Sequence, residues 1–210
     1  MNVTDQLRDE ILEGVFRPGE RLIELNLGER YGVGRAGVRA ALLELDSEGL
    51  VDREANRGAT VRRISLEEAI EIAEVRGILE GLIARHAAAN ATAGERAELQ
   101  TIVNDMRDAV GAGDQLAYSK LNAALHRRLR EISRHDIADG LVANLRNRAA
   151  HHQYRLALMP GRSEVSLPQH EAIVDAVAAG DSDRAEEAMH QHLASVADVL
   201  RQWAELGVNV

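Results

Sequence analysis

The hydrophobic pattern of the chain changes at Ser65, and this change limits the possible folds more than any other feature. Before Ser65, apolar residues occur in short runs separated by turn-forming residues such as the Pro-Gly pair at 18–19. After Ser65, a helical period continues to about residue 206, and Ser-Leu-Glu-Glu at 65–68 is typical of a capping box. We therefore expect two domains, residues 1–64 and residues 65–210.

The composition favours helices in the second domain. Hydrophobic residues make up 45% of the chain but aromatic residues only 2%, so the core must be built from Ala, Leu, Ile and Val. The apolar period predicts helices over about residues 65–90, 93–110, 114–132, 135–158, 163–179 and 181–206. We expect a mainly α protein whose second domain is an all-helical bundle with short connections.

The first domain has the element order of a winged helix-turn-helix. Its pattern predicts helices over about residues 3–13, 25–31 and 35–47, then β-prone runs at 50–54 and 58–64 that suit a hairpin. In such a domain the N-terminal residues of the third helix reach base edges in the DNA major groove. Arg35 and Arg39 lie at this position, although their charge pattern alone also fits two surface arginines.

Charge and cysteine content exclude several classes of protein. The net charge of −9 argues against a protein that coats nucleic acid nonspecifically, but it leaves room for a local basic face. The absence of cysteine excludes disulfides, thiolate metal sites and cysteine nucleophiles. Because the sequence has neither a signal peptide nor an apolar stretch of about 20 residues, we expect a soluble cytoplasmic protein that makes no membrane contact.

Residues 3–64 resemble the amino-terminal domain of GntR-type bacterial transcription regulators. The recognition segment of that family usually reads Val-Ser-Arg-Thr-Pro-Val-Arg-Glu-Ala-Leu, and here residues 33–42 read Val-Gly-Arg-Ala-Gly-Val-Arg-Ala-Ala-Leu. Both arginines are kept, whereas Gly34 and Gly37 replace the serine and the proline. Glycine inside a helix costs about 0.5–1 kcal/mol relative to alanine, so we expect a looser recognition helix.

The resemblance also implies a homodimer that reads an inverted repeat in double-stranded DNA. It assigns base contacts to Arg35 and Arg39, because a guanidinium can hold guanine O6 and N7 in a contact worth about 1–3 kcal/mol of discrimination. At the tip of the hairpin, Arg57 and Gly58 are expected to reach the minor groove, where glycine permits close approach of the backbone.

The second domain places three histidines among helical apolar residues, where an imidazole needs a hydrogen-bond partner or a metal. They are His126, His170 and His192, and Asn122 shares a helical face with His126 because it lies four residues earlier. Three histidines from three helices would suit Zn²⁺ or Ni²⁺. Each histidine alone is more often a core residue held by hydrogen bonds.

The order of motifs in the second domain resembles the FadR-type branch of GntR regulators, whose helical carboxy-terminal domain is the FCD domain. The motifs are Glu-Val-Arg-Gly-Ile-Leu-Glu-Gly at 74–81, a helix with Asn122 and His126 in the place of the family's Asp-x-x-x-His, then His-x-x-Ile and a late His-Leu pair. In that family an Asp and three His bind a divalent metal, and the metal together with an Arg holds a small organic acid. The resemblance implies a metal site at Asn122, His126, His170 and His192.

Asn122 stands where the family has an aspartate. Its amide oxygen can coordinate a metal but brings no charge, so the site should bind metal more weakly or rely more on a bound acid. For the carboxylate of that acid, the resemblance points to Arg76 in the Glu-Val-Arg motif. Arg155 is a further candidate, because one face of its helix can line the same cavity.

Three functions fit these features. The leading hypothesis is a DNA-binding transcription regulator whose operator affinity is controlled by a small carboxylate bound at a divalent metal. We expect a repressor, because repression is the commoner mode in the family it resembles. A metal-responsive regulator without an organic effector is the alternative. A metal-dependent enzyme is less favoured, because no recognisable motif places a Glu or Asp as general base, so we expect no catalytic activity.

Overall fold

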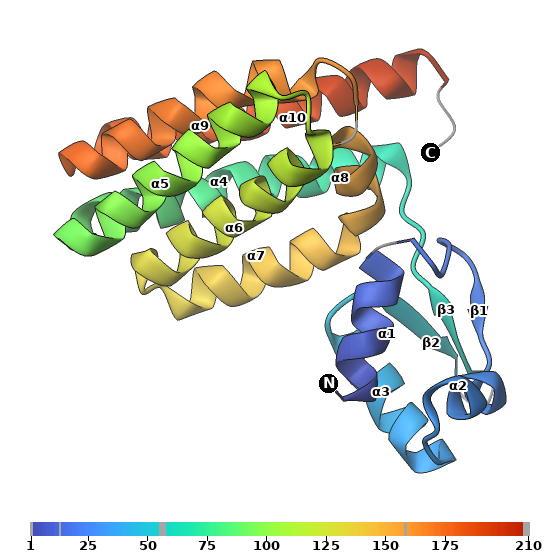
Figure 1. The fold of residues 1–210 in the computed structure, drawn as a ribbon. Helices are drawn as coiled ribbons and strands as arrows, with labels where there is room; N and C mark the ends of the chain where they lie inside the picture. Colours follow the sequence, from blue (N-terminus) through green and yellow to red (C-terminus); the bar gives the residue numbers. More distant parts are fainter. Residues whose placement is uncertain (1, 13, 55–57, 158, 208–210) are drawn as a thin grey trace. The chain divides into compact units, whose positions relative to one another are not determined.

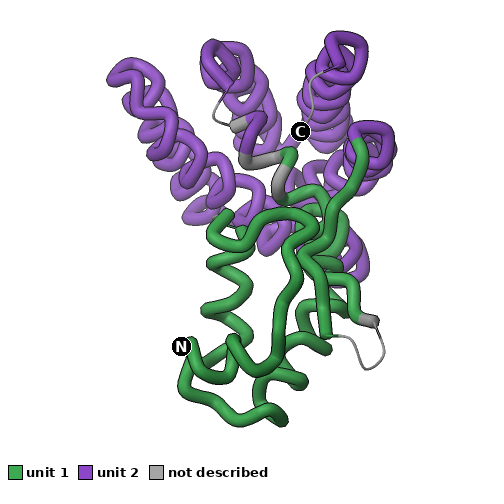
Figure 2. The backbone as a smooth tube through the Cα atoms, turned by 90° about the vertical axis from the view of Figure 1, so that its right-hand side faces the viewer, with its two compact units in different colours: residues 1–65, 143–154 green, residues 66–142, 155–210 purple. Residues whose placement is uncertain are grey.

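The computed structural model describes residues 2–12, 14–54, 58–157 and 159–207. It divides the chain into two compact units (Figure 2): an N-terminal unit of residues 1–65 and 143–154, and a helical unit of residues 66–142 and 155–210. Residues 143–154 thus group with the beginning of the chain. Within the N-terminal unit, Asn144 Nδ2 donates a hydrogen bond of 3.1 Å to the carbonyl oxygen of Ser47.

In the N-terminal unit, the described residues up to 65 form α-helices and a small antiparallel sheet (Figure 1). Its elements are α1 (Val3–Leu12), β1 (Arg21–Leu22), α2 (Glu24–Tyr31), α3 (Arg35–Ser47), β2 (Val51–Glu54) and β3 (Gly58–Val61). The strand order is β1-β3-β2, and Val51 lies opposite Val61 in the β2–β3 hairpin that the sequence predicts. The short strand β1 was not predicted, because its segment reads as a Pro-Gly turn.

The helical unit is a bundle in which long helices lie side by side (Figure 1). The helices from residue 66 onward are α4 (Leu66–Asn90), α5 (Ala93–Gly111), α6 (Gln115–Ser133), α7 (Asp136–Arg148), α8 (Ala150–Ala157), α9 (Arg162–Ala179) and α10 (Ser182–Glu205). Helix α4 packs against α6, α9 and α10, while α5 packs against α6 and α9. The predicted fold class is confirmed, but the single helix expected over 135–158 is wrong, because the chain leaves the helix at Ala149.

Side-chain caps explain where several of these helices begin. Thr92 Oγ1 accepts a hydrogen bond from the Glu95 backbone N–H, and the Glu95 carboxylate accepts one from the Thr92 N–H, which completes a capping box at α5. Asp114 and Asp181 accept bonds from backbone N–H groups at the starts of α6 and α10. Each cap satisfies a donor that a helix start would otherwise leave unpaired.

Close packing between α4 and α10 depends on small residues. A Cβ built on Gly81 would lie 2.2 Å from His190 Nε2, so only glycine fits there without moving the imidazole. Five of the eleven buried residues of α4 are alanines, among them Ala73, Ala84 and Ala87. Among the helices that the structure describes, none is long and apolar enough to cross a membrane.

We expect Leu129→Ala to lower the free energy of unfolding by about 2–5 kcal/mol, because Leu129 of α6 is 1% exposed and its truncation leaves a cavity. Leu116→Ala on the same helix is the matched control: Leu116 is 54% exposed, so its loss should change stability by less than about 0.5 kcal/mol. Urea unfolding followed by circular dichroism measures both. Equal losses in the two variants would contradict the assigned core.

Candidate metal centre and DNA-binding surface

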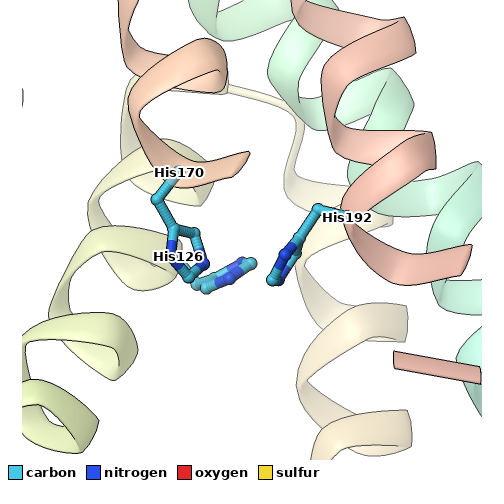
Figure 3. A group of neighbouring side chains, drawn as sticks. All are labelled: His126, His170 and His192. Atoms are coloured by element: carbon cyan, nitrogen blue, oxygen red, sulfur yellow. The ribbon is translucent and has the colours of Figure 1, made fainter. Parts of the chain in front are cut away.

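Three histidine side chains from three helices point toward one another inside the helical unit (Figure 3). His126 of α6, His170 of α9 and His192 of α10 are 3%, 1% and 5% exposed. One ring nitrogen from each lies within 4.8 Å of the other two, and the His170 and His192 ring centroids are 4.4 Å apart. The predicted trio is therefore brought together, which the spacing along the chain alone does not ensure.

Each of the three rings uses Nδ1 for a hydrogen bond to a neighbouring side chain. The bonds join His126 to Glu80 Oε2 at 2.7 Å, His170 to the Tyr118 hydroxyl at 3.0 Å and His192 to Gln169 Oε1 at 2.9 Å. In the tautomer with Nδ1 protonated, each imidazole donates this bond and presents Nε2 as the ligand atom. Partners of this kind fix the ring orientation and tautomer of metal-binding histidines.

Glu80 is itself held by a buried ion pair on α4. Arg76 Nη2 and Nε lie 2.6 Å and 2.8 Å from Glu80 Oε1, and the two side chains are 6% and 2% exposed. Arg76 thus already neutralises the carboxylate that orients His126. The role predicted for Arg76 at an effector carboxylate stays a prediction, but its guanidinium has a prior partner within the protein.

Asn122 lies on α6 one turn before His126, and its Oδ1 atom is buried. Among the residues that the structure describes, this oxygen has no hydrogen-bond partner, and neither has His170 Nε2. A buried acceptor atom without a partner is costly unless a ligand satisfies it. Three imidazoles and an amide oxygen form a donor set that fits a divalent ion such as Zn²⁺ or Ni²⁺.

Burial keeps two of the three imidazoles, His170 and His192, neutral. It lowers the pKa values of His170 and His192 well below the usual 6.5, and the nearby charges of His126 and Arg162 lower them further, while Glu80 opposes the shift. Both imidazoles are therefore uncharged at neutral pH, the form that binds a metal. None of the four predicted metal ligands carries a negative charge.

Arg155 takes part in a different contact. On α8 its guanidinium carbon lies 5.7 Å from the centroid of the Trp203 ring of α10, a cation–π geometry. Its predicted effector role stays a prediction.

The start of α3 carries the two arginines predicted to contact DNA. Arg35 is the first residue of the helix, and Arg39, whose side chain is 63% exposed, donates from Nε to both carboxylate oxygens of Glu24 at 3.0 Å and 2.9 Å. Gly34, at the N-cap, provides no side-chain cap. The arginines line a groove of about 510 Å³ together with Arg21, Ile23, Glu24, Leu25 and Gly58.

Gly58 begins β3 in the left-handed region, with φ of +90°, and a Cβ there would lie 3.0 Å from the Leu22 carbonyl oxygen. The backbone of the sheet therefore requires glycine at this position, whatever its distance from DNA. Arg57, the other residue predicted at the hairpin tip, lies outside the described residues.

Two family matches cover most of the chain. The bacterial regulatory proteins of the gntR family match residues 1–61, and the FCD domain matches residues 71–195. The chain belongs to the GntR family and carries an FCD domain. Its relatives are transcriptional regulators and not enzymes, so the chain is a transcriptional regulator and the hypothesis of a metal-dependent enzyme is removed.

Relatives of the regulator align over most of their length. It is 28% identical over 196 residues to the HTH-type transcriptional repressor RspR of Escherichia coli K12, covering 93% of this chain and 86% of that one. It is 29% identical over 219 residues to the HTH-type transcriptional regulator LutR of Bacillus subtilis, covering 94% and 99%. The solved structure of E. coli McbR/YncC has the same fold, with a TM-score of 0.81 at 24% identity over 96% of each chain.

The side chains that support the three histidines of the regulator were not predicted from its sequence. Tyr118 precedes Asn122 and His126 at four-residue intervals, a helical signal that could have found it. Glu80 had a weaker signal, since it follows Arg76 by four residues. Gln169 carried none, because its contact with His192 joins two helices.

Lowering the pH should destabilise the metal-free regulator more than its His170→Gln variant. The folded-state pKa of His170 lies below its unfolded value, so below about pH 6.5 the unfolded chain binds the extra proton. Each pH unit below that value then lowers the free energy of unfolding by up to about 1.4 kcal/mol, and the variant lacks this loss because it has no imidazole at residue 170. Urea unfolding at pH 7.5 and 5.5 in the presence of a chelator measures the loss of stability. Equal losses in the wild-type protein and the variant would refute the prediction.

Proposed function

We propose that the chain is a transcriptional repressor whose affinity for its operator is controlled by a small organic acid bound at a divalent metal, Zn²⁺ or Ni²⁺. The observation that carries this proposal is the buried trio of His126, His170 and His192, each oriented by a second side chain. The regulator acts in the cytoplasm as a homodimer that binds an inverted repeat in double-stranded DNA. Its two domains are residues 1–64, which bind DNA, and residues 65–210, which bind the effector and the partner protomer.

The three histidines and Asn122 would hold the metal in the core of the bundle. When bound, the ion supplies positive charge that attracts a carboxylate. The side chains of Glu80, Tyr118 and Gln169 keep the imidazoles in the orientation that presents Nε2. Burial keeps His170 and His192 neutral. Arg76 and Arg155 remain proposed neighbours of the acid.

Control of DNA binding requires that the acid bind one arrangement of the regulator more tightly than another. The difference in binding free energy between the two arrangements sets the largest possible change in operator affinity. A small acid held by charge deep in a bundle is suited to this, because packed helices shift between discrete arrangements rather than deform continuously.

On the DNA side, Arg35, Arg39, Arg57 and Gly58 form the proposed contact surface. Arg39 meets Glu24 through Nε, so its two Nη groups can still hold guanine O6 and N7. Glu24 would then limit the rotamers of Arg39 and reduce the entropy lost on binding.

Arg35→Ala and Arg39→Ala should each reduce discrimination between operator and random duplex by about 1–3 kcal/mol. Fluorescence anisotropy measures the affinity for a duplex that the wild-type protein selects from a random library and for a scrambled duplex. Arg127→Ala on α6, whose side chain is also 63% exposed, is the control and should leave the affinity ratio unchanged. A preserved ratio in both recognition-helix variants would remove them from base recognition.

Elemental analysis with native mass spectrometry should find a dimer with about one Zn or Ni per chain. His170→Ala should lose the ion, because a neutral ligand is removed from the centre. Asn122→Asp should hold it against higher chelator concentrations, since it adds an anionic ligand, whereas Asn104→Asp, at an exposed position on α5, should not. Equal chelator sensitivity of the Asn122→Asp and wild-type proteins would exclude residue 122 from the metal shell.

The same protein tests the alternative of a metal-responsive regulator. If the metal alone changes operator affinity of the metal-free protein, and carboxylates add nothing, the ion is the signal. If the metal alone changes little and a carboxylate changes the affinity only of metal-loaded protein, the acid is the signal.

A further inference from the structure

Among the residues that the structure describes, a buried arginine of the helical unit has no anionic partner. Arg162, the first residue of α9, is 7% exposed. Its Nη1 donates a hydrogen bond of 2.9 Å to Ser195 Oγ, whereas its Nη2 is buried without a hydrogen-bond partner in the described part of the chain. Burial lowers the pKa of this guanidinium, and the same energetic cost leaves it in need of an anion.

Arg162 lies on the elements that carry the metal centre. On α9, residues 162, 166 and 170 follow at four-residue intervals and share one helical face. On α10, its partner Ser195 lies three residues from His192, again on one face. The hydrogen bond to Ser195 therefore places the Arg162 guanidinium about one helical turn from His192 along α10.

The turn of the bundle beside the histidines is polar although the surrounding core is apolar. Tyr118 and Ser166 are each 4% exposed and interact through their hydroxyl groups. Tyr118 also contacts His170 Nδ1. Together with Arg162 and Ser195, these hydroxyls provide hydrogen-bonding groups for an oxygen-rich ligand.

The two buried arginines, Arg76 and Arg162, differ in their bonding partners. Arg76 is paired with Glu80, so adding a carboxylate beside it would compete with an existing ion pair. Within the described ranges, the Arg162 side chain hydrogen-bonds only the neutral hydroxyl of Ser195. A guanidinium with an unused Nη group can bind a carboxylate through charge-assisted hydrogen bonds without breaking any bond that the protein already makes.

We propose that Arg162 anchors the carboxylate of the effector, a short organic acid that carries a second oxygen donor for the metal. This inference rests on the proposed function, since it concerns the same site. Ser195 orients the guanidinium, and the Tyr118 and Ser166 hydroxyls contact the acid between Arg162 and the metal. The acid thereby supplies negative charge that Asn122 and the three histidines do not provide.

The test is calorimetric titration of metal-loaded protein with acetate, malonate and malate as probes. Acetate tests a bare carboxylate, and the other two add a second oxygen donor. Wild-type protein should bind malonate or malate more tightly than acetate. Arg162→Gln should weaken that binding by about tenfold or more at unchanged metal content, and Arg162→Lys should restore part of it. Arg201→Gln, at a half-exposed arginine of α10, is the control and should bind as the wild type does.

A stability measurement separates an anchoring role from a structural one. Without acid, Arg162→Met should melt at the same temperature as the wild type or higher, because it removes a buried charge that has no anionic partner in the described part of the chain. A marked drop in the melting temperature of acid-free Arg162→Met and Arg162→Gln, with acid binding lost only together with metal, would overturn the inference.

The outcomes distinguish this inference from the proposed function. If Arg162→Gln binds the acids as the wild type does, while His170→Ala loses both metal and acid, the inference fails and the proposed function stands. If metal-loaded wild-type protein binds none of the three probes, the inference and the acid-controlled function both fail, and the metal-responsive alternative replaces them.

Discussion

Two buried contacts in series, Arg76 with Glu80 and Glu80 with His126, hold the side chains at the centre of the helical unit in place. The three side chains are nearly inaccessible to water, so each depends on its neighbour to compensate the free energy lost when its polar groups leave water. Removing one partner of a buried ion pair commonly costs about 3–5 kcal/mol, because the other charge is left alone. These contacts join α4 to α6 at the level of the histidines, and the position of the His126 ring depends on them.

The shortage of aromatic residues has a direct consequence for this centre. Helices whose facing sides carry Ala and Gly approach closely, as Gly81 of α4 does against His190 of α10. In such a bundle, side chains as short as histidine can meet from three helices, and the three ring nitrogens lie within 4.8 Å. Larger core residues would separate the helices and leave the imidazoles out of reach of a common ion. The composition thus contributes to the site as well as to the fold.

Much of this architecture could be predicted because it is local in sequence. The winged-helix elements, the bundle and the helical faces of Asn122 and His126 follow from periodicity and turn residues. The break at Ala149 had no glycine or proline to mark it. The Glu80–His126 contact spans 46 residues and the pairing of β1 with β3 depends on tertiary structure, so neither leaves a local pattern. The family resemblance assigned effector binding to Arg76, but only the structure reveals that Glu80 already neutralises it.

The charge balance of the centre links these observations to regulation. Arg76 and Glu80 cancel, while His170, His192 and Asn122 are neutral. A bound divalent ion would therefore place two further positive charges near Arg162, which has no anionic partner among the described residues. An aspartate at residue 122 would offset part of this charge permanently, whereas asparagine leaves the compensation to a ligand. Under the proposed function, metal and acid must then each strengthen the binding of the other by the same factor, because the coupling between two ligands is reciprocal.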